Sequence, residues 1–168
     1  FETGLFVTPP VIFMTSTGVR SDGLPAVSDL RPAWCKKRQQ MYMKKMVVNS
    51  KGCWTGKKAR RDKYVRTTLT KGVAAQRLAL RDGVLATGKE RSYYLHHVSW
   101  YAEGHRLPLP RKEHLSHLCH NQGCFNPNHL CLESPQANMP RKGCVGHVDC
   151  PNCSTRINVC THDPPCIM

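Results

Sequence analysis

The chain has 168 residues and a formal net charge of +14, with a mean hydropathy of −0.46. This length suits one domain with an ordinary hydrophobic core. The apolar run at residues 5–14 is short, contains two prolines and lacks a basic start, so it predicts neither a membrane-spanning helix nor a signal peptide. The charge favours a polyanion such as nucleic acid, with a solvated basic surface or a nuclear-import patch as the alternative.

The ten cysteines are interleaved with histidines in a way that favours zinc over disulfides. One pattern is Cys-x4-Cys-x4-His at Cys119, Cys124 and His129, which supplies most of a tetrahedral zinc site. A second is Cys-x-His-x3-Cys near the end of the chain. Reduced thiols imply a reducing compartment, so we expect the nucleus or the cytoplasm.

Residues 1–50 predict an N-terminal arm followed by a basic helix. Residues 1–30 mix Pro, Gly, Ser and Thr with short apolar runs, and Pro32–Val48 is predicted to be helical with Pro32 in the first turn. Cys35 is expected to be a buried or free thiol. This helix either lies on DNA phosphates or packs against the body. Residues 31–71 hold 14 Lys or Arg against one acid, which strengthens the case for a nucleic-acid partner.

Three further elements are expected before residue 110. Lys63–Thr70 is rich in Thr and basic residues and predicts a strand, which either reads a DNA groove or forms a charged edge. Val73–Arg81 predicts a short helix. Tyr93–Tyr101 is a core strand or a helix, since periodicity does not separate them at this length. His96 and His97 are expected to pack or to form hydrogen bonds there.

The segment from 114 to 140 predicts two strands and a helix. His114–Leu118 and His129–Glu133 are the expected strands, and Ser134 is a suitable N-cap. Pro140 is expected to end the helix that follows. This arrangement would bring His117 close to Asn138 although they are 21 positions apart.

A longer set of residues in the same region carries a resemblance to a known family. The matching residues are Ser116-His117-Leu118-Cys119-His120-Asn121, Cys124, Asn126-Pro127, His129-Leu130-Cys131, Glu133-Ser134 and Asn138. In this spacing the chain resembles the His-Cys box homing endonucleases, within the wider ββα-metal (His-Me finger) nucleases. The resemblance covers residues from about 53 to 168. It implies a small α+β zinc-stabilised nuclease domain at 51–168, with an antiparallel DNA-facing sheet and few short helices.

The resemblance also implies catalytic roles. His117 would be the general base, Asn138 would bind one Mg²⁺, and Arg91 would bind phosphate. A neutral histidine suits proton abstraction near neutral pH, and an amide oxygen is a hard ligand that suits Mg²⁺. Without the resemblance, His117 would be interpreted as a zinc ligand and Asn138 as a surface amide.

Two structural zinc sites follow from the resemblance. Their implied ligands are Cys53, Cys119, Cys124 and His129 for the first, and Cys144, Cys160, His162 and Cys166 for the second. Cys35 competes with Cys53 in the first site, and Cys150 with Cys153 in Cys-x2-Cys spacing forms a rival for the second. His120 and Cys131 are spare and are expected to stabilise the loop or core.

The resulting hypothesis is a Mg²⁺-dependent endonuclease that acts on double-stranded DNA. The alternative is a non-catalytic zinc-finger module that binds DNA or RNA, or an interaction module of a larger protein. A homodimer is possible, but the chain ends two residues after Cys166, and residues 145–159 look inserted relative to the family. Because of these two departures, the sequence does not decide whether the chain forms a homodimer.

Overall fold

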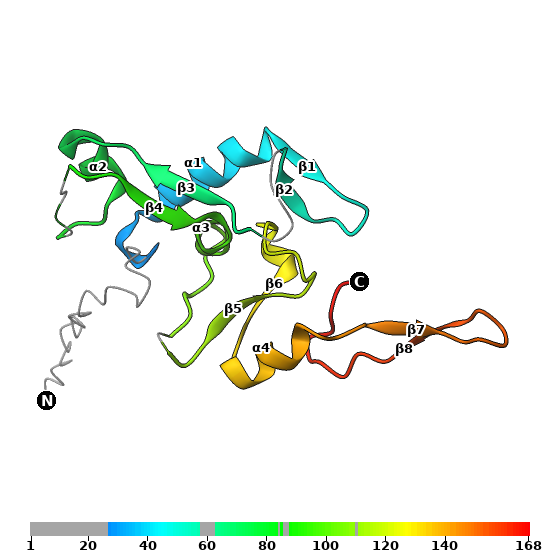
Figure 1. Ribbon diagram of the computed structural model, residues 1–168. Helices are drawn as coiled ribbons and strands as arrows, with labels where there is room; N and C mark the ends of the chain where they lie inside the picture. The colour runs from blue at the N-terminus through cyan, green and yellow to red at the C-terminus, as the bar shows by residue number, and fades with distance from the viewer. Residues whose placement is uncertain (1–26, 58–62, 84, 86–87, 110) are drawn as a thin grey trace, which may run out of the picture.

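The structure is a computed structural model that describes residues 27–57, 63–83, 85, 88–109 and 111–168. Within these residues the chain forms four α-helices, four two-stranded antiparallel sheets and two short 3-10 turns (Figure 1). The α+β class predicted from the sequence is therefore confirmed. No helix in the described ranges is long and apolar enough to cross a membrane.

The first helix is shorter than predicted. The 3-10 turn η1 (Val27–Asp29) leads into α1 (Pro32–Met43), which starts at the predicted proline. The prediction that it continues to Val48 is wrong, because Met46–Val48 forms strand β1 and pairs with β2 (Trp54–Gly56). Adjacent β-branched residues favour a strand once a partner is present, and that partner follows one turn later.

The next sheet leads into a helix that packs against α1. Strand β3 (Arg66–Leu69) pairs with β4 (Arg91–Tyr94), and α2 (Val73–Ala79) lies between them in the chain. The predicted segment Tyr93–Tyr101 combines both alternatives, since it ends β4 and then forms most of α3 (Leu95–Ala102). The prediction that His96 and His97 pack inside is confirmed, because both side chains are buried.

The main core joins the N-terminal helix to the rest of the molecule. Helix α1 packs against α3, and Cys35 is fully buried in the same cluster as Tyr93 and Phe125. Residues 27–50 therefore contribute to the core of the predicted nuclease domain. The remainder of the predicted arm, residues 1–26, lies outside the described residues.

The C-terminal third begins with a ββα unit. Strand β5 (His114–His117) pairs with β6 (Leu130–Glu133), and the 3-10 turn η2 (Pro127–His129) immediately precedes β6. Helix α4 (Pro135–Arg141) follows, with the Ser134 hydroxyl accepting a hydrogen bond from the amide of Ala137, as expected of an N-cap.

Pro140 does not end helix α4, contrary to the prediction. It lies inside the last turn, and the helix reaches Arg141. Proline removes one backbone donor, but so near the end of a short helix the loss is small. The final turn closes instead through the amides of Lys142 and Gly143, which donate to the carbonyls three residues earlier.

Residues 145–159, which were expected to be an insertion, contain a hairpin that extends from the body. Strands β7 (His147–Asp149) and β8 (Arg156–Asn158) pair in antiparallel register and lead away from α4 (Figure 1). The chain then returns to the ββα unit, where the amide of Ile167 donates to the carbonyl of Leu118.

Candidate active site and metal centres

The first Cys3His cluster is buried at the junction of the core and the ββα unit. Its members are Cys53, Cys119, Cys124 and His129, whose ligand atoms all lie within 4.8 Å of one another. The Cys124 Sγ and His129 Nδ1 atoms are 3.7 Å apart. Zinc bonds to sulfur and nitrogen place tetrahedral ligand atoms roughly 3.5–3.8 Å apart, so this set fits zinc. These are the four residues that the resemblance implied.

Cys53 reaches this cluster through a tight turn that brings it beside η2. Asn49 Oδ1 accepts a hydrogen bond from the Cys53 amide, and Asn126 Nδ2 donates to the carbonyl of Gly52. Gly52 has φ +74, and a Cβ atom there would lie 3.5 Å from His129 Nε2. Any other residue would be strained in this backbone conformation. Cys35, the competing ligand, is instead buried in the main core.

The second Cys3His cluster lies nearer the surface. Cys144, Cys160, His162 and Cys166 also place their ligand atoms within 4.8 Å of one another, and all four are half-buried. His162 Nδ1 is 3.4 Å from Cys160 Sγ and 3.7 Å from Cys166 Sγ, which again fits tetrahedral zinc. The rival pair, Cys150 and Cys153, is not among the residues gathered here, because the β7–β8 hairpin carries it away.

A buried ion pair connects the second cluster to the ββα unit. Arg141 Nη2 lies 2.7 Å from Glu133 Oε2, and the two side chains are only 3% and 7% exposed. Arg141 Nη1 also donates to the carbonyl of Pro164 and to Cys166 Sγ. Helix α4, strand β6 and the C-terminal segment are thereby held together by one guanidinium. Nothing in the sequence spacing singled out this residue.

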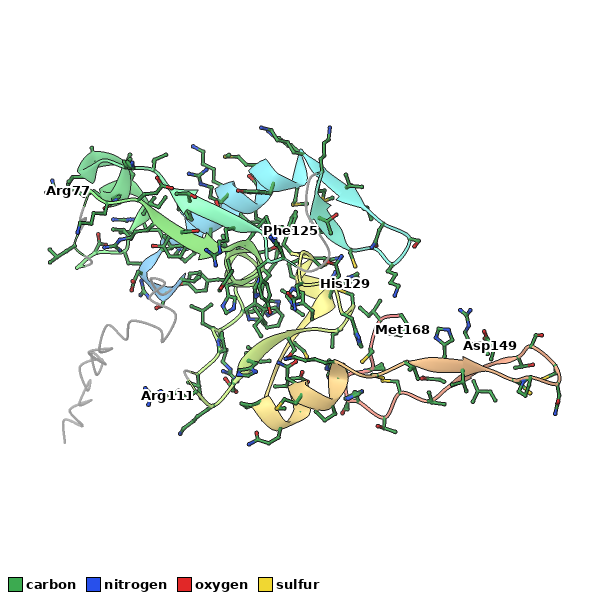
Figure 2. All side chains as sticks on the ribbon, in the orientation of Figure 1. Arg77, Arg111, Phe125, His129, Asp149 and Met168 are labelled. Carbon is green, nitrogen blue, oxygen red and sulfur yellow. The ribbon has the colours of Figure 1, made fainter. Side chains whose placement is uncertain are left out.

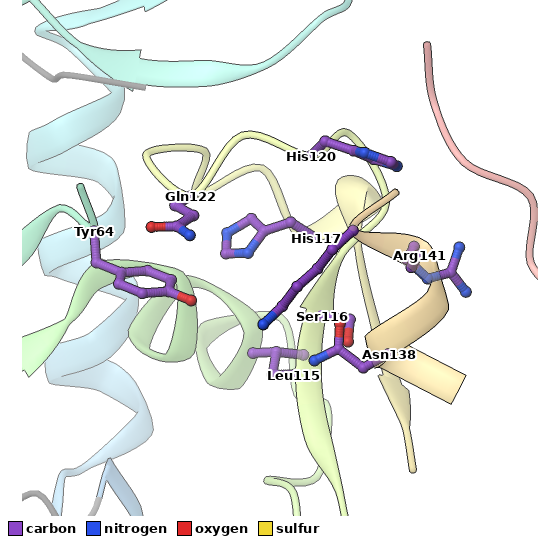
Figure 3. A pocket seen from close by; sticks show the side chains of 9 residues that line it. Tyr64, Leu115, Ser116, His117, His120, Gln122, Asn138 and Arg141 are labelled. Carbon is purple, nitrogen blue, oxygen red and sulfur yellow. The ribbon is translucent and has the colours of Figure 1, made fainter. Parts of the chain in front are cut away.

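His117 and Asn138 line the same pocket, as the predicted ββα arrangement requires. The pocket has a volume of about 310 Å³ and separates Tyr64 on one side from Asn138 and Arg141 on the other (Figure 3). Its lining consists of Tyr64, Leu115, Ser116, His117, His120, Gln122, Asn138, Arg141 and Lys142. His120, predicted to be spare, therefore borders this pocket.

The hydrogen bond of His117 defines which ring nitrogen can act as a base. Its Nε2 atom lies 2.9 Å from the carbonyl oxygen of Cys124. A carbonyl can only accept, so Nε2 carries the proton and Nδ1 keeps its lone pair. Burial lowers the pKa of His117 to about 4, which favours the neutral ring. His117 is not among the four residues whose ligand atoms gather in the first cluster.

An aromatic cluster holds the His117 ring from the side of α3 and the β3–β4 sheet. The ring centroid of His96 lies 4.8 Å from that of His117, and Tyr64 stacks on His96 at 5.1 Å. Tyr64 also contacts His117, at 5.9 Å between ring centroids. The aromatic composition of these segments was visible in the sequence, but their convergence on His117 depends on tertiary packing. In the all-side-chain view, α3 and the β3–β4 sheet lie next to the ββα unit (Figure 2).

Asn138 lies in the first turns of α4 and contacts a residue that the sequence interpretation did not include. Its Nδ2 atom is 3.0 Å from Nδ1 of His114, at the start of β5. With the amide nitrogen turned to His114, the Oδ1 atom faces away from it. His114 and His117 are three positions apart on β5, so their side chains alternate to opposite faces of the strand, and their spacing did not point to this contact.

Arg91 is the predicted catalytic residue that the structure does not bring to the pocket. It begins β4, and its guanidinium donates to the carbonyl of Leu85 at 3.2 Å. Arg66, in contrast, lies over the ring of Tyr94 at 5.1 Å, and that ring packs against Tyr64 at the pocket. The β3–β4 register places Arg91 at one end of the sheet and Tyr94, which packs near the pocket, at the other. The resemblance to the family could not reveal this register.

Comparison with known proteins agrees with this geometry. The model of a protein family described as the zinc-binding loop region of homing endonuclease matches residues 52–168, which include both clusters and the pocket residues His117 and Asn138. The chain belongs to this family. No solved structure matches the chain. The two Cys3His clusters are the zinc-like sites of this family member.

Proposed function

We propose that this homing-endonuclease family member hydrolyses the phosphodiester bonds of double-stranded DNA. In this proposal His117 is the general base and Asn138 binds one Mg²⁺. The supporting observation is that both side chains line one pocket, although they come from different elements of the ββα unit. A structural interpretation of either residue alone would not require this convergence.

His117 is suited to take a proton from the attacking water at Nδ1. The Cys124 carbonyl occupies the other ring nitrogen, and this hydrogen bond also stabilises the charged ring after the proton has moved. The rings of His96 and Tyr64 restrict its rotation. A fixed ring lowers the entropy cost of reaching a reactive geometry.

Asn138 is the residue of the pocket that would hold Mg²⁺. The lining residues include no carboxylate, so the ion would be held lightly, with waters and DNA phosphate oxygens as its other ligands. When bound, the ion supplies charge neutralisation at the phosphate and at the departing oxygen. The exposed ammonium of Lys142, which also lines the pocket, is placed to contact the same phosphate.

Zinc in both Cys3His clusters would be structural. Each cluster offers four protein ligands, which fill a tetrahedral shell and leave no open position for a substrate. The first zinc would hold the loop that carries the Cys124 carbonyl, and the second would hold the segment after α4. Neither ion would take part in the chemical step.

DNA is expected to lie along the β3–β4 sheet and the basic segment before it. Thr67 and Leu69 are buried while Arg66 is exposed, so the face of β3 that carries Arg66 is the one open to a groove. Lys57 and Lys63 flank this approach, whereas Lys58, Arg60 and Arg61 lie outside the described residues. Free thiols throughout support a reducing compartment, which we propose to be the nucleus or the cytoplasm.

The direct test is incubation of supercoiled plasmid with the protein and Mg²⁺, with EDTA as the control. His117→Ala should lower cleavage at least about 100-fold and leave zinc content and DNA affinity unchanged. His105→Ala is the matched control, since His105 stacks on Trp100 outside the pocket. Loss of one zinc in His117→Ala would identify His117 as a structural ligand and contradict the proposal.

The second candidate is a zinc-stabilised module that binds nucleic acid or another protein without cleaving it. The exposed basic residues and the two clusters support it equally well. Asn138→Ala separates the two functions. A nuclease loses Mg²⁺-dependent cleavage while it retains DNA binding, whereas a binding module shows no cleavage in either form.

A further inference from the structure

Asn138 is contacted from outside the pocket by a histidine at the start of β5. Its Nδ2 atom lies 3.0 Å from Nδ1 of His114. Asn138 lines the pocket, whereas His114 is not among the lining residues. The amide nitrogen can only donate, so Nδ1 of His114 accepts this hydrogen bond and the ring proton is on Nε2. His114 therefore contacts the candidate magnesium ligand without bordering the space that the substrate would occupy.

The β5–β6 register and the N-cap of α4 bring these two side chains together. His114 lies opposite Glu133, the last residue of β6, and Ser134 then caps α4. The backbone amide of Asn138 donates to the Ser134 carbonyl at 3.0 Å, within the first turn of the helix. Both residues are thereby held by regular secondary structure, and their side chains meet where α4 lies next to β5.

The orientation of an asparagine amide decides whether it can bind a cation. Its oxygen has two lone pairs, whereas its nitrogen carries two protons and has no lone pair to offer. Rotation about the last side-chain bond exchanges the two atoms, because this torsion is broad and roughly two-fold. The lining residues of the pocket include no carboxylate. The orientation of Asn138 therefore matters more here than it would in a site where Asp or Glu also held the ion.

We infer that His114 is a positioning residue, which holds the Asn138 amide by its nitrogen and leaves Oδ1 for Mg²⁺. This inference rests on the proposed function, in which Asn138 is the magnesium ligand. His114 itself neither touches the ion nor transfers a proton in this role. Partners that orient a metal ligand typically contribute tenfold or more to metal affinity. Because this hydrogen bond is exposed, its contribution should be smaller, at about threefold to tenfold.

The hydrogen bond can be tested without DNA. In the full chain labelled with a nitrogen isotope, NMR should detect a scalar coupling between Asn138 Nδ2 and His114 Nδ1 across the hydrogen bond. The coupling should persist when Mg²⁺ is added, because the contact with His114 leaves Oδ1 for the ion. A wild type without this coupling overturns the inference. A coupling that Mg²⁺ abolishes overturns it as well, since His114 would then bind the ion itself.

The effect on metal binding is measured with Mn²⁺ alone, from the paramagnetic broadening of the Asn138 side-chain signal. His114→Phe keeps a ring but removes the acceptor, and should raise the Mn²⁺ concentration for half-broadening about threefold to tenfold. His114→Asn restores an acceptor near the position of Nδ1 and should return this concentration to within about twofold of wild type. His105→Phe is the matched control, since His105 is also exposed but stacks on Trp100 outside the pocket.

Two results of the Mn²⁺ titration would overturn the inference. Equal broadening in His114→Phe and the wild type shows that the acceptor does not orient Asn138. Failure of His114→Asn to restore binding assigns the effect to the ring and not to its acceptor. Because His114 is exposed at the start of β5, each variant should unfold at the wild-type temperature, which separates a loss of positioning from a loss of folding.

Plasmid cleavage separates failure of this inference from failure of the proposed function. His114→Phe should require about threefold to tenfold more Mg²⁺ for half-maximal cleavage, with an unchanged rate at saturating Mg²⁺ and unchanged DNA affinity in EDTA. An unchanged Mg²⁺ requirement overturns the positioning role, while cleavage and its loss in Asn138→Ala still support the nuclease. If the wild type cleaves no DNA at any Mg²⁺ concentration, the proposed function fails, and the Mn²⁺ titration decides the role of His114.

Discussion

The two Cys3His clusters contain the same types of ligand but differ in burial and in how far apart their ligands lie in the sequence. The first is buried and joins Cys53, before the β3–β4 sheet, to Cys119, Cys124 and His129 in the ββα loop. The second is half-buried and gathers residues only from the segment after α4. A long loop closed by a buried metal changes the stability of the whole fold, whereas a short loop near the surface stabilises mainly its own segment. The sequence separation of the ligands therefore distinguishes a metal site that stabilises the whole fold from one that stabilises only its own segment.

Loss of the first cluster should have the largest effect. Structural zinc contributes roughly 10–16 kcal/mol in small domains, which equals or exceeds the total stability of a typical domain. Cys53→Ala should therefore prevent cooperative folding, as measured by circular dichroism and thermal unfolding. Cys35→Ala is the matched control, since this thiol is equally buried but belongs to the apolar core. It should keep its zinc and unfold cooperatively.

Loss of the second cluster should be confined to the C-terminal third. His162→Ala should remove one zinc ion and expose residues after Arg141 to protease, while the main core keeps its cooperative unfolding. His147→Ala, in the neighbouring strand, should retain both zinc ions. If His162→Ala unfolds the whole chain as Cys53→Ala does, the second cluster stabilises the whole fold and the proposed distinction between the two clusters is wrong.

The Arg141–Glu133 pair should be the main link between the second Cys3His cluster and the pocket. Arg141→Met leaves the Glu133 carboxylate buried without its partner, which should cost about 3–5 kcal/mol in denaturant unfolding. Glu133→Leu in the same chain should recover much of this loss, because no charge is then buried. Arg156→Ala removes the exposed pair with Asp149 and should cost under about 1 kcal/mol. Equal costs for the two arginines would contradict a role for burial.

The smallest effect is expected on DNA affinity. Replacement of Lys57 and Lys58 by Ala should flatten the slope of log K against log salt by up to about 2, since each phosphate contact contributes about 0.9. All DNA sequences should weaken alike, and zinc content should not change. Lys57 follows β2 directly, so its position is tied to the first region. An unchanged slope would indicate that these lysines do not contact DNA phosphates and that the DNA binds another face of the protein.

Much of the site could be predicted because its chemistry is local in the chain. His117, the ligands Cys119, Cys124 and His129, and Asn138 lie within one short segment, and the strand and capping signals around them are strong. The side chain of Ser134 and the pairing of β5 with β6 followed directly. Turn geometry and spacing alone could therefore bring His117 and Asn138 together.

Long-range contacts account for what could not be predicted. The end of α1 at Met43 depends on the pairing of β1 with β2, and the position of Arg91 depends on the β3–β4 register. The aromatic support of His117 by His96 and Tyr64 requires packing between segments far apart in sequence.

Residue types and their spacing indicated zinc-like ligand sets, because ligand chemistry is a property of short motifs; the candidate base and the candidate magnesium ligand were identified only through the family resemblance of the same segment. Residue types and spacing could not specify that Cys35 enters the core while Cys53 enters the first cluster, since each is a single buried cysteine in a basic region. Nor could they show that Arg141 joins Glu133 to the second cluster. Such choices depend on the free energy of burial, which only the packed arrangement of distant segments defines.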